Sequence, residues 1–386
     1  MKKIIVIQSN TVFKTFKYFT KGQLDFLNTK GLEVHTICSP DSEAEDFFKN
    51  ENAIYHSIKI ERDISLVKDI VSVIKITSSI KKITPHIVQG STPKAAFLTL
   101  LGAWINRVPV RIFFMRGVRS SVLSGIKQQV VGLMEKITCR LAHQVLCTSN
   151  SVREEIINKG ICPPEKAKVL HHGTGNGINT LRFNKDNFTL VEKNALYLKY
   201  NIDKNARILL FVGRLVKDKG IIELCHAWQI LKKKFPDVIL ILAGNEENIN
   251  PIPPDIINGL KNDKRVRMLG FINDCAPLYS IATIVILPSY GEGIPISILE
   301  ASAMELPVVV SKVTGCIDAV IDNQTGKLAN PRDAKDLEKK ITLYLLNPEL
   351  CKKHGIAGRK MVQERFQSEV IWEALYEQYI RLYKEL

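Results

Sequence analysis

Short runs of β-branched and apolar residues alternate along this chain with longer stretches in which apolar positions recur at helical spacing. Continuous apolar runs of this length predict strands buried on both faces, as in parallel sheets that helices cover. Seven strands are expected in the first half, at residues 4–8, 33–38, 54–58, 86–89, 110–115, 144–147 and 168–171. Five are expected in the second half, at residues 208–212, 238–243, 266–269, 283–287 and 308–311. Each half therefore reads as a doubly wound α/β domain.

The length of 386 residues is more than one hydrophobic core usually serves, which favours two domains. A polar stretch rich in Asn and Lys, between residues 173 and 207, is the expected place of the division. We place the domains at residues 1–183 and 184–365. An amphipathic helix is expected to follow over residues 366–386, because its apolar positions recur at helical spacing.

The segment 289–300 follows an apolar run that is expected to form a strand. It contains two carboxylates, Glu292 and Glu300, and the residues between them include Gly293 and Pro295. Pro295 suits the start of a helix, so Glu292 is expected on the loop and Glu300 inside the helix. Helix N-termini attract phosphate, and carboxylates accept hydrogen bonds from sugar hydroxyls. The segment is typical of a pocket for a nucleotide-linked sugar. The alternative is an ordinary strand–loop–helix unit with a solvated glutamate.

A second segment, residues 213–220, follows the strand at 208–212 and precedes a helix that is expected to begin at Ile221. Arg214 offers a planar fork of donors for phosphate oxygens, and Lys219 adds a mobile positive charge. Two such cations can stabilise the charge that grows on a departing diphosphate. The alternative is that both side chains are partners in surface salt bridges.

The first of these segments resembles the E-x(7)-E signature of retaining glycosyltransferases of the GT-B fold, specifically the large family four, and the second matches that family's G-R-L-x-x-x-K-G. The resemblance implies two Rossmann-like domains, each doubly wound around a parallel sheet, that face an interdomain cleft. It also implies that the closing helix crosses back to the first domain. For the site, it implies that Arg214 and Lys219 bind the donor diphosphate, that Glu292 holds donor-sugar hydroxyls, and that Glu300 accepts both ribose hydroxyls.

Further residues are expected around the nucleotide because they match the same family. Leu242-Ala243-Gly244 ends a strand at the expected cleft, and Leu269-Gly270-Phe271 resembles a family segment whose backbone lies near the base. The expected nucleotide-binding positions beside Glu300 are Gly213, Gly244, Gly270, Phe271, Gly293 and Ile294.

The first half matches the family less closely. Ser9-Asn10-Thr11 stands where many relatives carry a double glycine, and Gln89 and Ser91 replace two expected histidines. Arg116 occupies the place of a histidine that many relatives hold near the reacting sugar. Arg116, with Arg119 three residues later, is the candidate to meet an acceptor diphosphate or donor oxygens; a basic surface loop is the alternative.

The chain contains no Asp-x-Asp triplet, the pair with which the other major glycosyltransferase fold holds a divalent cation. Together with Arg214 and Lys219, this absence favours metal-independent transfer, with no metal site and no cofactor. The donor is expected to be a nucleotide-diphosphate sugar, with a UDP-sugar favoured. Eight cysteines without a C-x-x-C pair favour reduced thiols and a cytoplasmic protein.

The positive charge is concentrated in the first half: residues 1–180 hold 25 Lys and Arg against 14 Asp and Glu, +11 of the total +15. Such a surplus attracts nucleic acid, an anionic membrane or phosphorylated ligands. Lys mixed with Ile and Val in the helical stretch 67–82 suits a lipid surface as well as packing on the sheet. No recognisable nucleic-acid-binding module accompanies the charge. No apolar run is long enough for a signal peptide or a membrane span.

We therefore expect a retaining hexosyl- or N-acetylhexosaminyltransferase that acts in cell-surface polysaccharide assembly, such as capsule or lipopolysaccharide. Its acceptor is expected to be a glycan linked to polyprenyl diphosphate, or another saccharide, met at the inner face of the cytoplasmic membrane. Two alternatives on the same fold are a nucleotide-sugar epimerase and a soluble glucan or sucrose-type synthase. A basic nucleic-acid-binding protein is the alternative from another class, and the two phosphate-binding segments speak against it.

Overall fold

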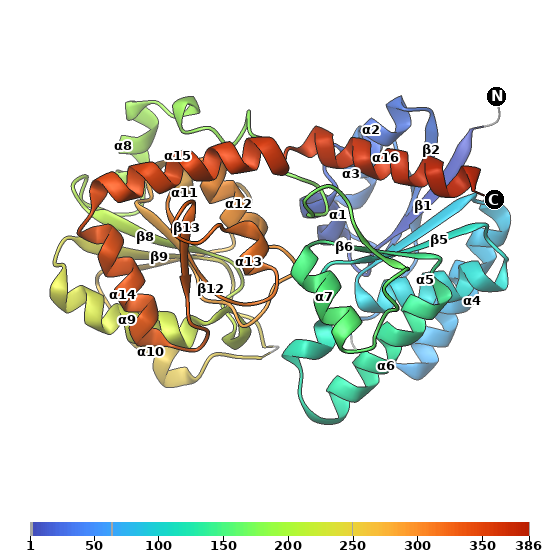
Figure 1. The fold of residues 1–386 in the computed structure, drawn as a ribbon, viewed down its shortest axis with the longest axis horizontal. Helices are drawn as coiled ribbons and strands as arrows, with labels where there is room; N and C mark the ends of the chain where they lie inside the picture. Colours follow the sequence, from blue (N-terminus) through green and yellow to red (C-terminus); the bar gives the residue numbers. More distant parts are fainter. Residues whose placement is uncertain (1–2, 63–64, 249, 386) are drawn as a thin grey trace. The chain divides into compact units, whose positions relative to one another are not determined.

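The computed structural model describes residues 3–62, 65–248 and 250–385. The chain forms two compact units, one made of Met1–Gly177 with Ser368–Leu386 and the other of Ile178–Gln367 (Figure 1). The breaks lie after Gly177 and after Gln367, whereas the sequence led us to expect them after residues 183 and 365. At the second unit's two ends the chain runs side by side, because the Ile178 amide donates to the Phe366 carbonyl over 2.7 Å.

The first unit is built on a seven-stranded parallel sheet with the order β3-β2-β1-β4-β5-β6-β7. Its strands occupy the predicted places to within one or two residues at their ends, which confirms that part of the fold. They are β1 (Ile4–Ser9), β2 (Leu32–Cys38), β3 (Ile54–Ser57), β4 (Ile87–Ser91), β5 (Val110–Met115), β6 (Gln144–Cys147) and β7 (Ala167–Val169). The order turns back at β1, which lies between β2 and β4, and ligands of such sheets bind at the carboxyl ends beside this point.

Helices cover both faces of this sheet, which is why most residues of its strands are apolar. One face carries α4 (Leu66–Ile83), α5 (Pro93–Ile105), α6 (Gly125–Leu141) and α7 (Asn150–Asn158). The other face carries α1 (Phe13–Phe19), α2 (Gln23–Thr29), α3 (Ala44–Asn50) and α16 (Ser368–Lys384). The final helix therefore packs on the first sheet, where Leu375 and Tyr379 are buried.

The second unit is built on a six-stranded parallel sheet with the order β10-β9-β8-β11-β12-β13. The strands are β8 (Arg207–Val212), β9 (Val238–Ala243), β10 (Val266–Gly270), β11 (Ile284–Leu287), β12 (Val308–Ser311) and β13 (Gly326–Ala329). The sequence predicted five of these six strands, so the expected number was too low by one. The missed strand, β13, is four residues long and contains Gly326 and Lys327, so it lacks an apolar run and owes its conformation to pairing with β12.

The helices of the second unit surround that sheet and share one hydrophobic core with it. They are α8 (Leu190–Lys199), α9 (Ile221–Lys234), α10 (Pro254–Lys261), α11 (Ala276–Ile281), α12 (Ile296–Ala303), α13 (Cys316–Ala319), α14 (Ala334–Leu345) and α15 (Pro348–Arg365). Across both units, none of the helices within the described ranges combines the length and the apolar character that crossing a bilayer requires.

Candidate active site

The loop after β8 brings Lys219 to the carboxyl edge of the second sheet. A 3-10 turn, Lys217–Lys219, precedes Gly220, which opens α9 with a φ of 72°. A Cβ at Gly220 would lie 2.0 Å from the Pro288 carbonyl oxygen, just after β11. Only glycine lets the two loops approach this closely. The backbone therefore holds Lys219 against the loop that carries Glu292.

Lys219 and Glu292 form an ion pair between Nζ and Oε1, as the prediction of a shared site requires. The side chains are 16% and 13% exposed, respectively, so solvent screens this pair only weakly. The Ser289 hydroxyl donates to the same carboxylate oxygen over 2.6 Å. The structure thus joins residues 73 positions apart in the chain at one point of the sheet edge.

Backbone contacts hold the Glu292 loop in place from the other side. The Glu292 amide donates to the Thr314 carbonyl over 3.0 Å. A Cβ at Gly315, whose φ is 79°, would lie 2.5 Å and 2.6 Å from the carbonyl oxygens of Glu292 and Gly293. The backbone at Gly315 therefore supports the loop that carries Glu292.

Arg214 lies on the β8 loop but pairs with a residue that the sequence did not single out. Its Nη1 contacts Glu247 Oε2 at 2.9 Å, and its side chain is half exposed. Glu247 follows the end of β9, which neighbours β8, and the Leu215 amide donates to the Asn245 carbonyl between these two loops. Both predicted cations are thus neutralised by carboxylates, but by two different ones.

Three of the predicted glycines meet where β8, β9 and β10 end. The Gly244 amide donates to the Gly270 carbonyl over 2.8 Å. A Cβ at Gly244 would lie 1.8 Å from the Gly213 carbonyl oxygen. These residues allow neighbouring strand ends to touch through their backbones. Phe271, directly after Gly270, keeps its ring exposed at this edge.

Glu300 lies inside α12, as predicted, and its carboxylate is held by Tyr279 of α11. The Tyr279 hydroxyl lies 3.0 Å from Glu300 Oε2 and 3.0 Å from the Ser297 carbonyl oxygen. Burial raises the pKa of Glu300 to about 7, and the bond from Tyr279 opposes part of that rise. The Glu300 carboxyl therefore gains or loses its proton near neutral pH. Nothing in the pattern of α11 indicated that Tyr279 would reach it.

The N-terminus of α12 follows Gly293 and Ile294 directly. Pro295 is the N-cap, one position before the helical turn in which the sequence placed it, and no side chain caps the helix. The backbone amides of the first turn are therefore not occupied by a cap. The Ile294 side chain is buried in the core, so only its backbone could meet a ligand.

In the first unit, Arg116 follows β5 at the carboxyl edge of the first sheet. Its guanidinium lies 5.0 Å from the Phe114 ring centroid and 5.3 Å from that of Phe19. Burial lowers its pKa to about 10, and it stays charged at neutral pH. Its Nε is buried and makes no hydrogen bond within the described part of the chain. The alternative of a basic surface loop does not describe Arg116, because its guanidinium lies against two aromatic rings and its Nε is buried.

Other buried polar atoms at the same edge also make no hydrogen bond to any described residue. Arg116 and Thr148 stand one step beyond the register pair Met115–Cys147, so they are neighbours on one face of the sheet. The Thr174 amide donates to the Thr148 carbonyl over 2.6 Å. The unsatisfied side-chain atoms are Ser9 Oγ, Asn10 Oδ1, Thr148 Oγ1 and Thr174 Oγ1.

Gln89, which replaces one of the expected histidines, has a partner in the final helix. The Tyr379 hydroxyl donates to Gln89 Oε1 over 2.8 Å, and Gln8 Nε2 donates to the same hydroxyl over 3.2 Å. All three side chains are buried. These glutamines therefore join α16 to β1 and β4.

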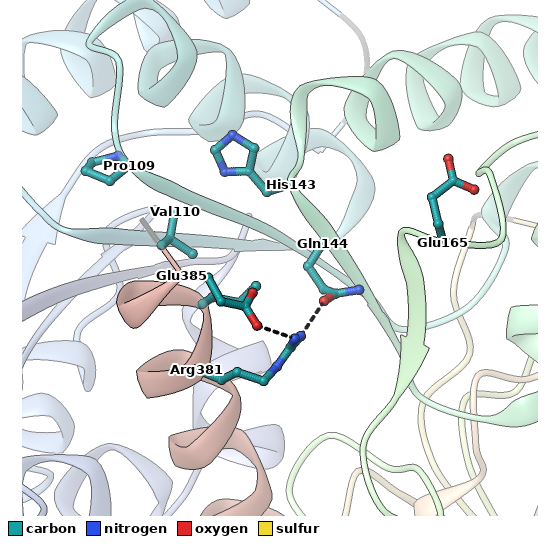
Figure 2. A pocket seen from close by; sticks show the side chains of 8 residues that line it. Pro109, Val110, His143, Gln144, Glu165, Arg381 and Glu385 are labelled. Atoms are coloured by element: carbon teal, nitrogen blue, oxygen red, sulfur yellow. Dashed lines mark hydrogen bonds and ion pairs between the residues drawn. The ribbon is translucent and has the colours of Figure 1, made fainter.

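A hollow of about 400 Å³ lies at the opposite, amino edge of the first sheet (Figure 2). Its walls include the starts of β5 and β6 and the end of α16, where Arg381 bonds to Glu385 and Gln144 over 2.7 Å and 3.2 Å. Because parallel strands place their carboxyl ends together, this hollow is separated from Arg116 by the length of the sheet. It is not the candidate active site.

Comparison with known proteins decides the family. The model described as Glycosyl transferases group 1 matches residues 193–361, and the one described as Glycosyltransferase Family 4 matches residues 23–174. The chain is 33% identical to a Staphylococcus aureus protein named "Capsular polysaccharide biosynthesis glycosyltransferase CapM", over 100% of this chain and 99% of that protein. The chain belongs to the glycosyl transferases group 1 family. As a member of this family, the protein is a glycosyltransferase.

Two further comparisons support the same family and fold. A Campylobacter jejuni protein named "N,N'-diacetylbacillosaminyl-diphospho-undecaprenol alpha-1,3-N-acetylgalactosaminyltransferase" is 29% identical over 70% of each chain. The crystal structure of Anabaena Alr3699/HepE in complex with UDP and glucose matches with a TM-score of 0.78 at 16% identity, over 97% of this chain and 98% of that one. The group 1 glycosyltransferase thus has the GT-B fold, with a doubly wound parallel sheet in each unit, as predicted.

The structure brings the predicted donor residues of this glycosyltransferase to one edge of one sheet, on the loops after β8, β9, β10 and β11 and on α12. It does not place Arg214 against Lys219, and it adds Glu247, Ser289 and Tyr279 as their partners or neighbours. Within the described ranges, no group of three or more His, Cys, Asp or Glu side chains is arranged to hold a metal ion. The catalytic and binding roles of the predicted residues stay predictions.

Proposed function

We propose that the protein transfers a hexose or N-acetylhexosamine from a nucleotide-diphosphate sugar, preferably a UDP-sugar, to a glycan carried on polyprenyl diphosphate. The transfer would retain the configuration of the donor sugar, require no metal and serve the assembly of a surface polysaccharide. The observation that carries the proposal is the Lys219–Glu292 pair, because it joins the two family motifs at the carboxyl edge of the second sheet.

The donor diphosphate would replace the carboxylates that are now paired with Lys219 and Arg214. Lys219 is paired with Glu292 and Arg214 with Glu247, so both cations are ordered before any ligand arrives. As the glycosidic bond breaks, negative charge grows on the leaving diphosphate, and two positioned cations stabilise it. No bound metal is needed for that step in this proposal.

Once a phosphate replaces it beside Lys219, the Glu292 carboxylate would accept hydrogen bonds from hydroxyls of the donor sugar. The amides around Gly293 and Ile294, beside the uncapped N-terminus of α12, would face a sugar or phosphate oxygen. Glu300 would accept both ribose hydroxyls, with Tyr279 keeping its carboxylate in place. Resemblance to the family implies that the acceptor hydroxyl attacks the donor from the side that the diphosphate leaves.

Arg116 is the proposed contact to the acceptor diphosphate or to donor oxygens. A charged guanidinium with an unsatisfied Nε can bind a phosphate without first losing a hydrogen bond. The names of the two relatives support the acceptor class, since one acts in capsular polysaccharide biosynthesis and the other on a diphospho-undecaprenol compound. The UDP in the HepE structure supports the preferred donor base.

The proposed place of action is the cytoplasmic face of the membrane that holds the acceptor. All eight cysteines are unpaired, which is usual for a reducing compartment. The enzyme would attach peripherally, and the excess of positive charge in residues 1–180 favours an anionic lipid surface over a neutral one.

The test is a reaction of the purified protein with UDP-, GDP-, ADP- and dTDP-linked sugars in the presence of a polyprenyl-diphosphate glycan. We expect a glycosylated acceptor with the anomeric configuration of the donor, and unchanged turnover in the presence of EDTA. UDP at a hundred times its Kd should raise the free energy of unfolding by about 2.7 kcal/mol. Donor consumption without acceptor, giving a free epimerised sugar, would establish the epimerase alternative instead.

A further inference from the structure

The helix α4 exposes an apolar stripe to solvent instead of burying it. Val67, Ile70, Val71 and Ile74 recur at the spacing of one helical face and are between 46% and 75% exposed. The opposite face, with Ile76 and Ile80, packs on the sheet. A helix at the surface of a globular domain usually shows the reverse pattern, with polar residues outside.

The two neighbouring helices repeat this pattern. Ile126, Val130 and Leu133 of α6 lie on its outward side and are between 43% and 79% exposed, while Glu135 and Cys139 face inward. The helix α5 lies against both α4 and α6. Its outward positions Phe97 and Leu101 are half-buried, and Trp104 is 55% exposed. The outward sides of these three helices, here called the α4–α6 outer face, therefore each carry exposed or half-buried apolar residues.

Positive charge surrounds the outer face. Seven exposed cations lie on these helices: Lys68, Lys75, Lys81 and Lys82 on α4, and Lys127, Lys136 and Arg140 on α6. The described residues of α4, α5 and α6 include two acidic side chains. Asp69 pairs with Lys94 at 2.6 Å, and Glu135 is buried and accepts from the Ser120 hydroxyl at 2.6 Å.

We propose that the α4–α6 outer face docks on an anionic lipid bilayer, with its apolar stripes among the acyl chains near the headgroups and its cations on lipid phosphates. Helices with an apolar face and a rim of Lys lie in the membrane interface in this way. The proposal deepens the proposed function and rests on it in one respect, that the acceptor is lipid-linked. It adds the surface that docks and the three helices that form it.

The charge selects a lipid surface over a second copy of this chain. A self-complementary contact through the outer face would bring the seven cations of one copy towards those of the other, and no exposed carboxylate on these three helices would offset the repulsion. An anionic bilayer supplies the opposite charge over the whole face. Each Lys or Arg near such a surface contributes favourably to binding.

The position of the outer face within the first unit suits a lipid-linked acceptor. The stripes lie in the first turns of α4 and α6, which begin at the carboxyl edge of the sheet, because crossover helices of a parallel sheet start where the strands end. Arg116 and its unsatisfied neighbours lie at that same edge. A lipid-linked diphosphate at Arg116 and the membrane that holds the lipid would thus both contact the first unit at the carboxyl edge of its sheet.

The test is flotation of the full chain with vesicles of phosphatidylcholine alone or with an equimolar share of phosphatidylglycerol. We expect retention on the anionic vesicles at low salt and little on the neutral ones. Ile74→Glu with Ile126→Glu should reduce the partition coefficient by more than about tenfold, since both side chains leave the acyl region. Lys75→Gln and Lys136→Gln should each reduce it about fivefold, on anionic vesicles only.

Leu198→Glu is the matched control, because Leu198 is 78% exposed on α8 of the second unit. Equal retention of all variants, no retention of the unaltered protein, or a dimer that Ile74→Glu dissociates would overturn the docking proposal. Turnover with a water-soluble acceptor analogue separates the two proposals. Vesicle binding without any transfer would support the docking proposal and contradict the proposed function. Transfer without vesicle binding would support the proposed function and contradict the docking proposal.

Discussion

The carboxyl edges of the two sheets differ in whether their polar side chains have partners within the protein. At the second sheet, the side chains of the predicted site pair with one another or with neighbours: Lys219 with Glu292, Arg214 with Glu247, and Tyr279 with Glu300. At the first sheet, buried polar atoms of Ser9, Asn10, Arg116, Thr148 and Thr174 make no hydrogen bond to a described residue. The polar side chains at the edge of the second sheet thus have partners within the protein, whereas several at the edge of the first sheet have none among the described residues.

The difference teaches what each edge requires of a ligand. If the donor binds at the second edge, as proposed, it would have to exchange partners with these ion pairs, which would select a group that offers both charge and hydroxyls. A ligand at the first edge would bond to these atoms without first breaking a hydrogen bond that they make. Each buried donor or acceptor left unpaired there costs roughly 1–3 kcal/mol of stability, which a bound acceptor would restore.

The largest expected effect comes from removing Lys219, the less exposed of the two cations at the edge of the second sheet. Lys219→Ala should lower turnover about 10²- to 10³-fold, because one group placed against transition-state charge contributes roughly 3–4 kcal/mol. Donor consumption with saturating acceptor measures it. Lys217→Ala, in the same 3-10 turn but exposed, is the control and should retain full activity. Equal turnover of the two variants would remove Lys219 from the mechanism.

At the carboxyl edge of the first sheet, Arg116→Gln should raise the acceptor KM about tenfold to a hundredfold, since hydrogen bonds to charged groups contribute roughly 1.5–3 kcal/mol. Donor KM should change little. Arg119→Gln is the matched control, because Arg119 uses its backbone amide to bond Glu135 and was the other candidate in this loop. Sensitivity at Arg119 with none at Arg116 would reverse the assignment.

Nucleotide binding should depend on the proton of Glu300. Burial raises its pKa to about 7, so the carboxylate that ribose hydroxyls require is lost as the pH falls below 7. Affinity for UDP should fall up to about tenfold per pH unit there. Isothermal titration between pH 5 and 8 checks this dependence. Glu300→Gln should bind weakly and lack that part of the pH dependence; an unchanged slope would contradict the ribose role.

The same raised pKa has a consequence for stability. The folded chain keeps a proton on Glu300 that the unfolded chain releases at the ordinary pKa of glutamate. The contribution of this group to the free energy of unfolding therefore decreases as the pH rises from about 4.5 to about 7. Chemical denaturation of the Glu300→Gln variant should lack this decrease.

Two serines with fully buried side chains allow the two edges to be compared directly. Ser289 donates to Glu292, whereas Ser9 Oγ has no partner among the described residues. Ser289→Ala should lower the free energy of unfolding by about 1 kcal/mol, and Ser9→Ala should leave it unchanged or raise it by about as much. Urea denaturation of both variants provides the measurement. Equal losses would mean that Ser9 is satisfied after all.

The smallest expected effect tests whether Arg214 must exchange partners. Glu247→Gln removes the competing carboxylate and should lower the donor KM by about twofold to fivefold, because half-exposed ion pairs contribute roughly 0.2–1 kcal/mol. Steady-state kinetics with varied donor will show it. Glu246→Gln, whose carboxylate pairs with Lys261, should leave the donor KM unchanged. A rise in donor KM for Glu247→Gln would mean that Glu247 itself contacts the donor.

Much of the fold could be predicted from the sequence, because parallel strands that are covered on both faces are mostly apolar. Twelve strands were located in this way, and β13 was missed because Gly326 and Lys327 break the apolar run. The glutamate and lysine motifs also lie on the expected loops. Partners such as Glu247 and Tyr279 could not be foreseen, since each lies more than twenty positions from the residue it contacts.

The amino-acid order alone thus determined the two α/β domains, the family and the two motifs predicted to bind the donor, because those features depend on local periodicity and on short spacings. Tertiary structure decided which charges neutralise each other, which buried polar atoms are left without a partner, and that three helices turn apolar faces outward. These properties depend on contacts between distant segments and on which face of each element meets the sheet. They arise only when β8, β9 and β11, or α4, α5 and α6, come to lie side by side.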